Sequence, residues 1–295
     1  MSFSTTMRAV LTSAALSLVA LPAAADDKMQ IVASFSILGD MVEEVVGDLA
    51  TVTTIVGPDA DAHIYQPSVA DARAVAEADV IFVNGLGFET WSDALISESG
   101  TEADVHIATA GITPLKVEGE TDPHAWNSLP NGMIYVQNIA AVMSEAMPDH
   151  ADEISANAEA YMAELKSLDT DARDRLSKLP EDRRTVVTAH DAFGYLADAY
   201  GLTFLAPVGM DTDAEPSAKE VAELIDQLKA DGAAALFVEN ITSPALVQQI
   251  SDETGIAIGG QIYSDALSEQ GGPATSYLAM FQHNLSTILT ALSKS

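Results

Sequence analysis

Residues 149–180 read DHADEISANAEAYMAELKSLDTDARDRLSKLP, and this stretch decides the fold. Its apolar residues recur at three- and four-residue steps, at Tyr161, Leu165, Leu168, Ala172 and Leu179. Charged residues fill the positions between them, and Pro180 closes the run. The spacing predicts one long surface helix of about 30 residues, on the order of 45 Å at 1.5 Å per residue. A coiled-coil partner is the alternative, but the stripe lasts only about four heptads and is weak in leucine. We therefore expect the helix to pack along two lobes and to join them.

On both sides of this helix, short β-branched runs alternate with amphipathic stretches. This alternation is typical of α/β lobes with mainly parallel sheets. Strands are expected at 30–34, 51–56, 80–84 and 105–108 in the first half, and at 185–189, 203–207, 235–238 and 256–259 in the second. Helices are expected around 37–46 in the first half, and at 193–200, 217–230, 244–253 and 273–292 in the second.

The predicted fold class is therefore α/β, with two lobes that each hold a mainly parallel β-sheet flanked by helices. One long connecting α-helix joins the lobes. The expected organisation is a signal peptide at 1–25, an N-terminal α/β lobe at 26–148, the connecting helix at 149–180 and a C-terminal α/β lobe at 181–295.

The first residues predict export. Arg8 is the only charged residue before Asp26, an apolar run covers 9–21, and three alanines follow at 23–25. A positive charge, an apolar core and a small-residue cleavage site form a secretory signal peptide, and the run is too short to span a bilayer. A buried N-terminal helix would explain the apolar run alone. We expect a mature chain that begins near Asp26 and lies in the periplasm.

The composition excludes several kinds of partner and chemistry. The chain has no cysteine, which excludes disulfides, thiolate metal ligands and a lipid-modified N-terminal cysteine, so we expect no membrane anchor. The formal net charge of −31 repels nucleic acid and anionic lipid and attracts cations. A solvated surface suited to a salty habitat is the better explanation of most of this charge. A monomer is expected.

Four residues are candidate metal ligands because they lie in loops at strand ends or helix starts, namely His63, His124, His190 and Asp265. Open α/β sheets bind ligands in such loops. Two of the four come from each half of the chain, so a cleft between the lobes would bring them together. Three imidazoles and one carboxylate form a four-coordinate zinc set. Taken singly, however, each histidine is more often a surface or capping residue than a ligand.

Four motifs, in order, carry a family resemblance: GPDADAHIYQP at 57–67, DPHAW at 122–126, AHDAFGYL at 189–196 and YSDAL at 263–267. Through them the whole mature chain resembles the zinc- and manganese-binding solute receptors of ABC transporters, often called TroA-like. The resemblance implies a binding protein, not an enzyme, that hands a metal ion to a cognate ABC permease. It also implies that His63, His124, His190 and Asp265 are the ligands. A metallochaperone that loads the protein is a further candidate partner.

Two departures from the family pattern bear on the metal. Zinc-specialised members often carry a long histidine-rich insert before the second ligand, whereas the segment here, KVEGET at 116–121, is short and has no histidine. Manganese-type relatives commonly have a carboxylate at the position of His190. Three nitrogen ligands favour zinc, because affinity for such sites rises from manganese towards zinc. We expect Zn²⁺ as the transported ligand, with Mn²⁺ as the alternative.

A zinc-dependent enzyme is the rival class, since three histidines with an open position would activate water. The carboxylate of Asp265 argues against it, because a fourth protein ligand closes the coordination shell. Glu239 and Asn240 follow a predicted strand, and each either supports a ligand imidazole or satisfies loop backbone. His106 is expected to be structural, and Trp126 to be a packing residue.

Overall fold

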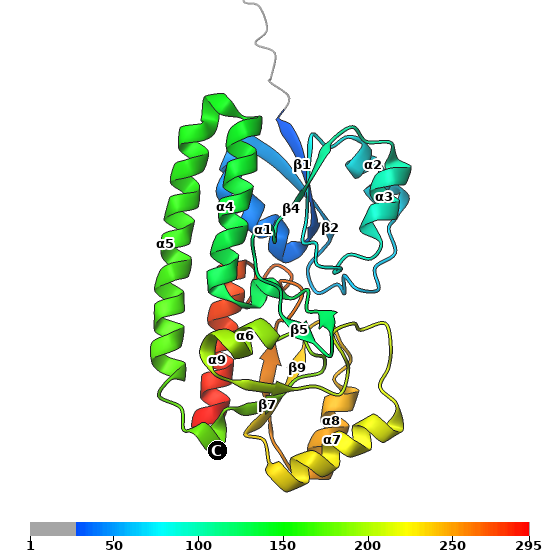
Figure 1. The fold of residues 1–295 in the computed structure, drawn as a ribbon, viewed down its shortest axis with the longest axis vertical. Helices are drawn as coiled ribbons and strands as arrows, with labels where there is room; N and C mark the ends of the chain where they lie inside the picture. Colours follow the sequence, from blue (N-terminus) through cyan, green and yellow to red (C-terminus); the bar gives the residue numbers. More distant parts are fainter. Residues whose placement is uncertain (1–27, 295) are drawn as a thin grey trace, which may run out of the picture.

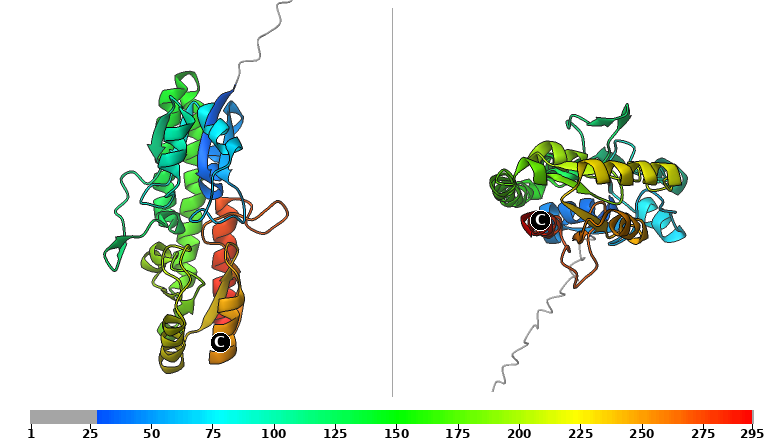
Figure 2. Two further views of the ribbon diagram at one scale, coloured as in Figure 1. Left: turned by 90° about the vertical axis from the view of Figure 1, so that its right-hand side faces the viewer. Right: turned by 90° about the horizontal axis from the view of Figure 1, so that it is seen from below.

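The computed structural model describes residues 28–294, in which two α/β lobes lie end to end with long helices along one side (Figure 1, Figure 2). The predicted signal peptide at 1–25 lies outside the described residues. Each lobe holds a four-stranded parallel sheet. The predicted fold class is confirmed. Between residues 28 and 294, no helix combines the length and the hydropathy that a membrane crossing requires.

The two sheets share one strand order. In the N-terminal lobe the order is β2-β1-β3-β4, with β1 at Met29–Phe35, β2 at Ala50–Val56, β3 at Val80–Val83 and β4 at Asp104–Ile107. In the C-terminal lobe it is β10-β9-β7-β8, with β7 at Thr185–Val187, β8 at Thr203–Leu205, β9 at Ala235–Glu239 and β10 at Ile258–Ile262. If the four strands of each lobe are numbered in chain order, both sheets have the order 2-1-3-4, with the C-terminal sheet read from β8 to β10. All eight predicted strands are present.

The last strand begins two residues later than predicted, at Ile258 instead of 256. It ends at Ile262, three residues past the predicted end, and so includes two glycines, although glycine usually weakens strands. Close packing explains why glycine stands at these two positions. A Cβ on Gly259 would lie 2.6 Å from the Ala291 side chain, and one on Gly260 would lie 2.8 Å from that of Thr287. Both neighbours belong to the helix α9, Tyr277–Lys294, and the glycines let that helix approach the strand closely.

The remaining helices flank the sheets: α1 Ser36–Val46, α2 Val69–Ala76, α3 Ser92–Ser99, α4 Leu129–Ala146, α6 Gly194–Tyr200, α7 Ala218–Asp231, α8 Ala245–Thr254 and α9 Tyr277–Lys294. Short 3₁₀ turns occur at Gly47–Leu49, Ala125–Asn127, Pro148–His150 and Glu181–Arg183. A two-residue hairpin, β5 at Lys116–Val117 and β6 at Glu120–Thr121, was not predicted. Strands of two residues are too short to show an alternating pattern.

The connecting helix α5 runs over Ala151–Leu176, so its 26 residues are fewer than the expected 30 or so. Its expected first turn is a separate 3₁₀ segment, Pro148–His150, and its end is followed by a turn in which the Leu179 amide donates to the Leu176 carbonyl. The predicted stripe is buried, and α5 packs against α1 and α4 of one lobe and α6 and α9 of the other (Figure 1).

One apolar core extends along this helical side and includes residues of both lobes, from Ile31 to Leu292. A second, smaller core lies in the C-terminal lobe, where Val187, Val221 and Val247 meet beneath α7 and α8. The helix α9 also reaches the N-terminal lobe, because its first amide, on Tyr277, donates to Asp40 Oδ2 of α1 at 2.8 Å. The lobes are therefore joined by a packed core as well as by the connecting helix.

Candidate metal centre

The four predicted ligands converge between the lobes. His63, His124, His190 and Asp265 are all buried, and one potential ligand atom from each lies within 4.8 Å of the others. Among residues 28–294 they form the one cluster with this property. His63 and His124 come from loops of the N-terminal lobe. His190 follows β7 and Asp265 follows β10 in the C-terminal lobe.

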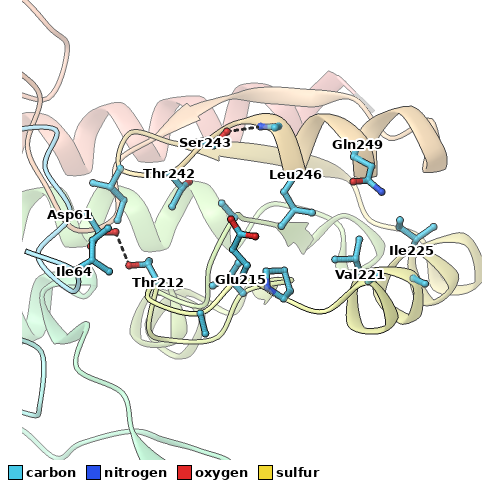
Figure 3. Close-up of a pocket in the computed structure, with 18 of the residues that line it drawn as sticks. Asp61, Ile64, Thr212, Glu215, Val221, Ile225, Thr242, Ser243, Leu246 and Gln249 are labelled. Atoms are coloured by element: carbon cyan, nitrogen blue, oxygen red, sulfur yellow. Dashed lines mark hydrogen bonds between the residues drawn. The ribbon is translucent and has the colours of Figure 1, made fainter.

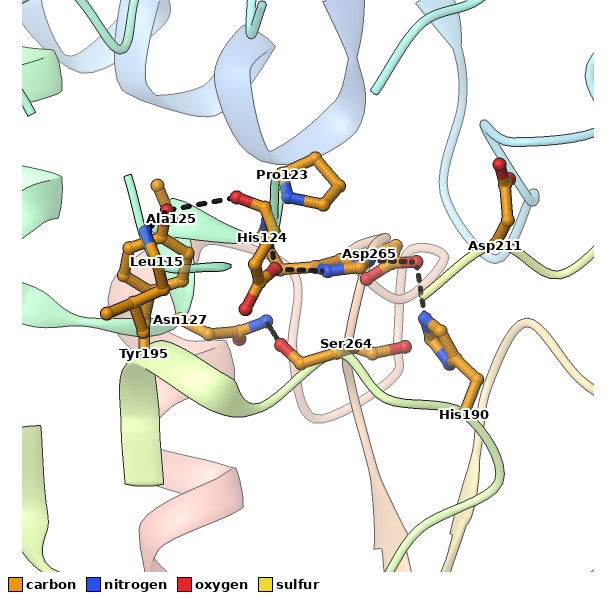
Figure 4. Close-up of polar contacts among 12 residues, drawn as sticks. Leu115, Pro123, His124, Ala125, Asn127, His190, Tyr195, Asp211, Ser264 and Asp265 are labelled. Carbon is orange, nitrogen blue, oxygen red and sulfur yellow. Dashed lines mark hydrogen bonds and ion pairs between the residues drawn. The ribbon is translucent and has the colours of Figure 1, made fainter. Parts of the chain in front are cut away.

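The spacing of the ligand atoms fits a single ion. Asp265 Oδ2 lies 3.2 Å, 3.8 Å and 3.1 Å from the Nε2 atoms of His63, His124 and His190. The Nε2 atoms of His63 and His124 are 3.3 Å apart. A tetrahedron with zinc bonds of about 2.0–2.1 Å has edges of about 3.3–3.4 Å. Figure 4 shows His124 and His190 reaching Asp265 from opposite directions.

Each imidazole has a second carboxylate behind it, at Nδ1. His190 Nδ1 lies 2.5 Å from Glu239 Oε2, and His124 Nδ1 lies 2.8 Å from Asp122 Oδ1. His63 Nδ1 lies 3.0 Å from Asp211 Oδ1. A carboxylate at Nδ1 holds the proton on that nitrogen and leaves the Nε2 lone pair free for a metal. All three Nε2 atoms face Asp265, so the arrangement selects the tautomer that a cation needs.

Glu239 serves both of the roles that the sequence left open. Its Oε1 accepts the backbone amides of Ala189 and His190 at 2.8 Å and 2.9 Å, while its Oε2 faces the imidazole. Asn240 has a different role, because its amide donates to Asp59 Oδ1 and to the Ala266 carbonyl. It thus ties the first ligand loop to the loop that carries Asp265.

Sequence reasoning missed two of the supporting carboxylates. Asp122 stands in the DPHAW motif, and its Oδ1 also accepts the His124 backbone amide at 2.9 Å, which is the signal of a local turn. Asp211 left no such signal, since it is 148 positions from His63 in the chain. Only the folding of the C-terminal lobe places it there.

Charge in the cluster shifts the acidity of its members. Burial alone would raise the pKa of Asp265, but the charges of His190 and His124 and hydrogen bonds from His190 and His63 hold it far below its usual value. Burial alone would lower the pKa of His190, but the charges of Glu239 and Asp265 raise it well above its usual value. Burial alone would also lower the pKa of His63. The hydrogen bond to Asp265 and the charge of Asp265 raise it instead. Protons therefore compete with a cation for His63 and His190.

Aromatic side chains enclose the cluster. The Phe88 ring lies edge-on to His63 at 4.8 Å, and the Trp126 ring lies 5.4 Å from His124. Trp126 is fully buried, as a packing residue should be, and its indole also donates to the Ser264 carbonyl at 2.7 Å. The second ligand segment is thus bonded to the residue before Asp265. Tight packing of this kind fixes the imidazoles and excludes water.

The other histidines lie outside this cluster. His106 packs on Phe82 with ring centres 5.7 Å apart, which agrees with the structural role expected for it. His150 lies 3.9 Å from Glu153 on the surface, and His283 contacts the Gln261 carbonyl.

Three imidazoles and one carboxylate, buried between two α/β lobes that stiff helices connect, define a metal-binding receptor of the two-lobed class. Residues 31–291 match the family model described as "Zinc-uptake complex component A periplasmic". The chain belongs to this family, whose members are metal-binding, substrate-binding proteins of ABC transporters and not enzymes. The family membership implies a permease partner and a metal ion as substrate.

Individual relatives differ in the metal that they are named for. The chain is 34% identical over 267 residues to the manganese-binding lipoprotein MntA of Halalkalibacterium halodurans, which covers 90% of this chain and 89% of the relative. It is 35% identical over 268 residues to the iron-binding protein YfeA of Yersinia pestis, covering 88% and 85%. The periplasmic zinc-binding protein TroA of Treponema pallidum has a similar structure, with a TM-score of 0.86 and 29% identity over 90% of this chain and 99% of that one.

Proposed function

We propose that this chain is the periplasmic receptor of a metal importer, and that it captures one zinc ion with His63, His124, His190 and Asp265 for delivery to an ABC permease. The observation that carries the proposal is the pairing of every imidazole with its own carboxylate at Nδ1. A histidine that served packing alone would not need its Nε2 lone pair free. Here the Nε2 atoms of three histidines and one carboxylate oxygen lie within 4.8 Å of one another.

Zinc is the proposed metal because the donor set is rich in nitrogen. Affinity of imidazole for divalent metals rises steeply from manganese towards copper and zinc. The 3.1–3.3 Å separations between three of the ligand-atom pairs also suit short bonds to a four-coordinate ion. The relative TroA, which is named for zinc, supports the same choice.

Manganese is the second candidate, and one observation favours it. Asp265 Oδ1 is buried and has no hydrogen-bond partner among the described residues. A bidentate carboxylate would use this oxygen as a fifth ligand, and hard carboxylate oxygens suit manganese. Relatives named for manganese and iron point in the same direction.

We also propose that the receptor is a free monomer. Several relatives are named lipoproteins, whereas this chain has no cysteine to carry a lipid. In this proposal residues 1–25 are removed on export, 26–148 and 181–295 are the two lobes, and 149–180 is the connecting segment. A metallochaperone that loads the site remains a candidate partner.

The test is a competition titration of the exported protein, purified from the periplasm and stripped with a chelator, with zinc against manganese. We expect one equivalent of zinc, bound far more tightly than manganese. Comparable affinities would mean that the substrate is manganese, or whichever of the two metals is available. Binding of neither metal would refute the proposal. Intact mass of the same sample determines where the mature chain begins.

Two variants separate the proposed ligands from other histidines. His190→Ala removes a buried ligand and should abolish tight binding while the circular dichroism stays unchanged. His150→Ala removes an exposed imidazole outside the cluster and should bind zinc as the wild type does. Near-wild-type affinity in the His190 variant would sink the ligand assignment.

A further inference from the structure

A loop of the C-terminal lobe crosses to the N-terminal lobe beside the site. This loop, residues 208–216, lies between β8 and α7. Near its tip, Asp211 Oδ1 lies 3.0 Å from His63 Nδ1, and the Thr212 hydroxyl donates to Asp61 Oδ2 at 2.6 Å. Figure 3 shows the Thr212–Asp61 bond, and Figure 4 shows Asp211 on the far side of Asp265 from His124. Both contacts reach the segment that holds the first ligand.

The base of the loop is attached to another ligand. Val208 pairs with His190 as an isolated parallel bridge, and the Asp191 amide donates to the Gly209 carbonyl at 3.2 Å. Asp61 extends the connection at the tip, because its Oδ1 accepts the His63 backbone amide at 2.9 Å. The loop therefore links the third ligand, in its own lobe, to the first ligand in the other lobe.

Asp211 differs from the other two carboxylates behind the imidazoles. Asp122 and Glu239 are buried and belong to the same lobe as the histidine that each faces. The Asp211 side chain is 58% exposed and belongs to the lobe opposite His63. A movement of this loop away from the N-terminal lobe would therefore remove the partner of His63 and leave those of His124 and His190 in place.

The loop lies over open space and not over a packed core. A groove of about 660 Å³ lies beneath it, between α7 and the segment after β9. Apolar side chains such as Val221, Ile225 and Leu246 line the groove, and Glu215 of the loop is also among the lining residues (Figure 3). With little packing below, the polar contacts at the tip contribute much of what holds the loop against the N-terminal lobe.

We infer that residues 208–216 form a latch over the metal, in which Asp211 and Thr212 are positioning residues that set the rate of metal release. The inference rests on the proposed metal-binding function. Asp211 holds the His63 proton on Nδ1 and so keeps Nε2 directed at the ion. Loss of either contact lets the His63 segment move away, and the ion then has three ligands instead of four. A partly exposed ion pair is a weak interaction in water, so the latch opens without large cost.

The test measures zinc release from the purified exported protein by stopped flow, with a chromogenic zinc chelator in excess. Asp211→Ala and Thr212→Val each remove one tip contact, and Thr212→Val keeps the side-chain volume. Asp213→Ala, an exposed neighbour on the same loop, is the matched control. We expect both latch variants to release zinc about 3- to 10-fold faster, the factor that the loss of one hydrogen bond or of one ion pair of similar strength gives. The control should match the wild type.

Two further readouts separate a latch from a structural role. The association rate should stay unchanged, because zinc enters before the latch closes. The double variant should release zinc more slowly than the product of the single effects predicts, because one open latch cannot open twice. Release rates of both single variants within twofold of the wild type would overturn the latch, as would a slower association rate with unchanged release. A wild-type protein that binds neither zinc nor manganese would instead refute the proposed function.

Discussion

The substitution Glu239→Gln tests how the site selects the tautomer of His190. The glutamate Oε1 accepts two backbone amides, and its Oε2 lies 2.5 Å from His190 Nδ1. A glutamine of nearly the same size keeps its oxygen on the two amides and turns its NH₂ towards Nδ1. A donor at that position needs an unprotonated Nδ1, so the imidazole proton moves to Nε2. That atom faces Asp265 at 3.1 Å, where the metal should bind.

The expected loss follows from the contact that the variant breaks. To bind zinc, His190 must return its proton to Nδ1, which then faces the N–H of the amide. The close contact between Nδ1 and the charged carboxylate is lost, and a polar contact with a charged group contributes about 1.5–3 kcal/mol. Since about 1.4 kcal/mol is a factor of ten, zinc affinity should fall about 10- to 150-fold.

The pH profile should change as well. Glu239 is the first of the charges that raise the pKa of His190 in the folded protein, so its removal lowers that pKa. Protons then compete less with zinc in the variant, and its affinity stops rising at a lower pH than that of the wild type. The ratio of the wild-type zinc affinity to that of the Glu239→Gln variant should therefore be larger at pH 9 than at pH 7.

The assay is a chelator competition titration at both pH values, with Glu89→Gln as the matched control. Glu89 is likewise buried after a strand, and it accepts the backbone amides of Asn84 and Gly85 at 2.6 Å and 3.2 Å. Its described partners include no imidazole. The control should lose thermal stability without losing zinc affinity. Affinity of the Glu239 variant within about threefold of the wild type, with the same pH profile, would refute the reasoning.

Three other predictions concern protons, packing and lobe motion. Because the pKa values of His63 and His190 are raised, protons compete with zinc from well above pH 6.5, so affinity falls as pH falls. Calorimetry in buffers of different ionisation enthalpy should find about one to two protons released per zinc at pH 7, and no release would contradict the assignment. Gly194→Ala places a Cβ 2.5 Å from Asp122 Oδ2, which should displace the carboxylate behind His124. Zinc binding in the same titration should weaken about 10-fold. Unchanged affinity would count against this role of Asp122. Because α5 and a shared core join the lobes, X-ray scattering with and without zinc should differ little, and a gross change of profile would show a flexible hinge.

Local pattern determined most of the fold. A central parallel strand such as β3 is covered on both faces and is apolar throughout, and short β-branched runs identified all eight strands. The stripe at 149–180 identified the connecting helix because one face of a surface helix must be apolar over its whole length. The predicted boundaries of α5 and β10 were wrong because they depend on local turn hydrogen bonds and on close packing against α9, which periodicity does not contain.

The sequence by itself also determined which residues to consider as ligands. Three histidines and an aspartate follow strands or precede helices, and the carboxyl ends of parallel strands meet at one edge of each sheet. The family resemblance then singled out the four. Nothing in their spacing showed that two lobes would bring them within 4.8 Å.

Only the tertiary structure decided how the site works. The carboxylates of Asp211 and Glu239 stand 148 and 49 positions from the imidazoles that they face, so no local pattern connects them. Their effect is also electrostatic, and its size depends on burial and distance, which a sequence does not contain. The tautomers, the raised histidine pKa values and the loop that crosses between the lobes all follow from the way the two sheets face each other.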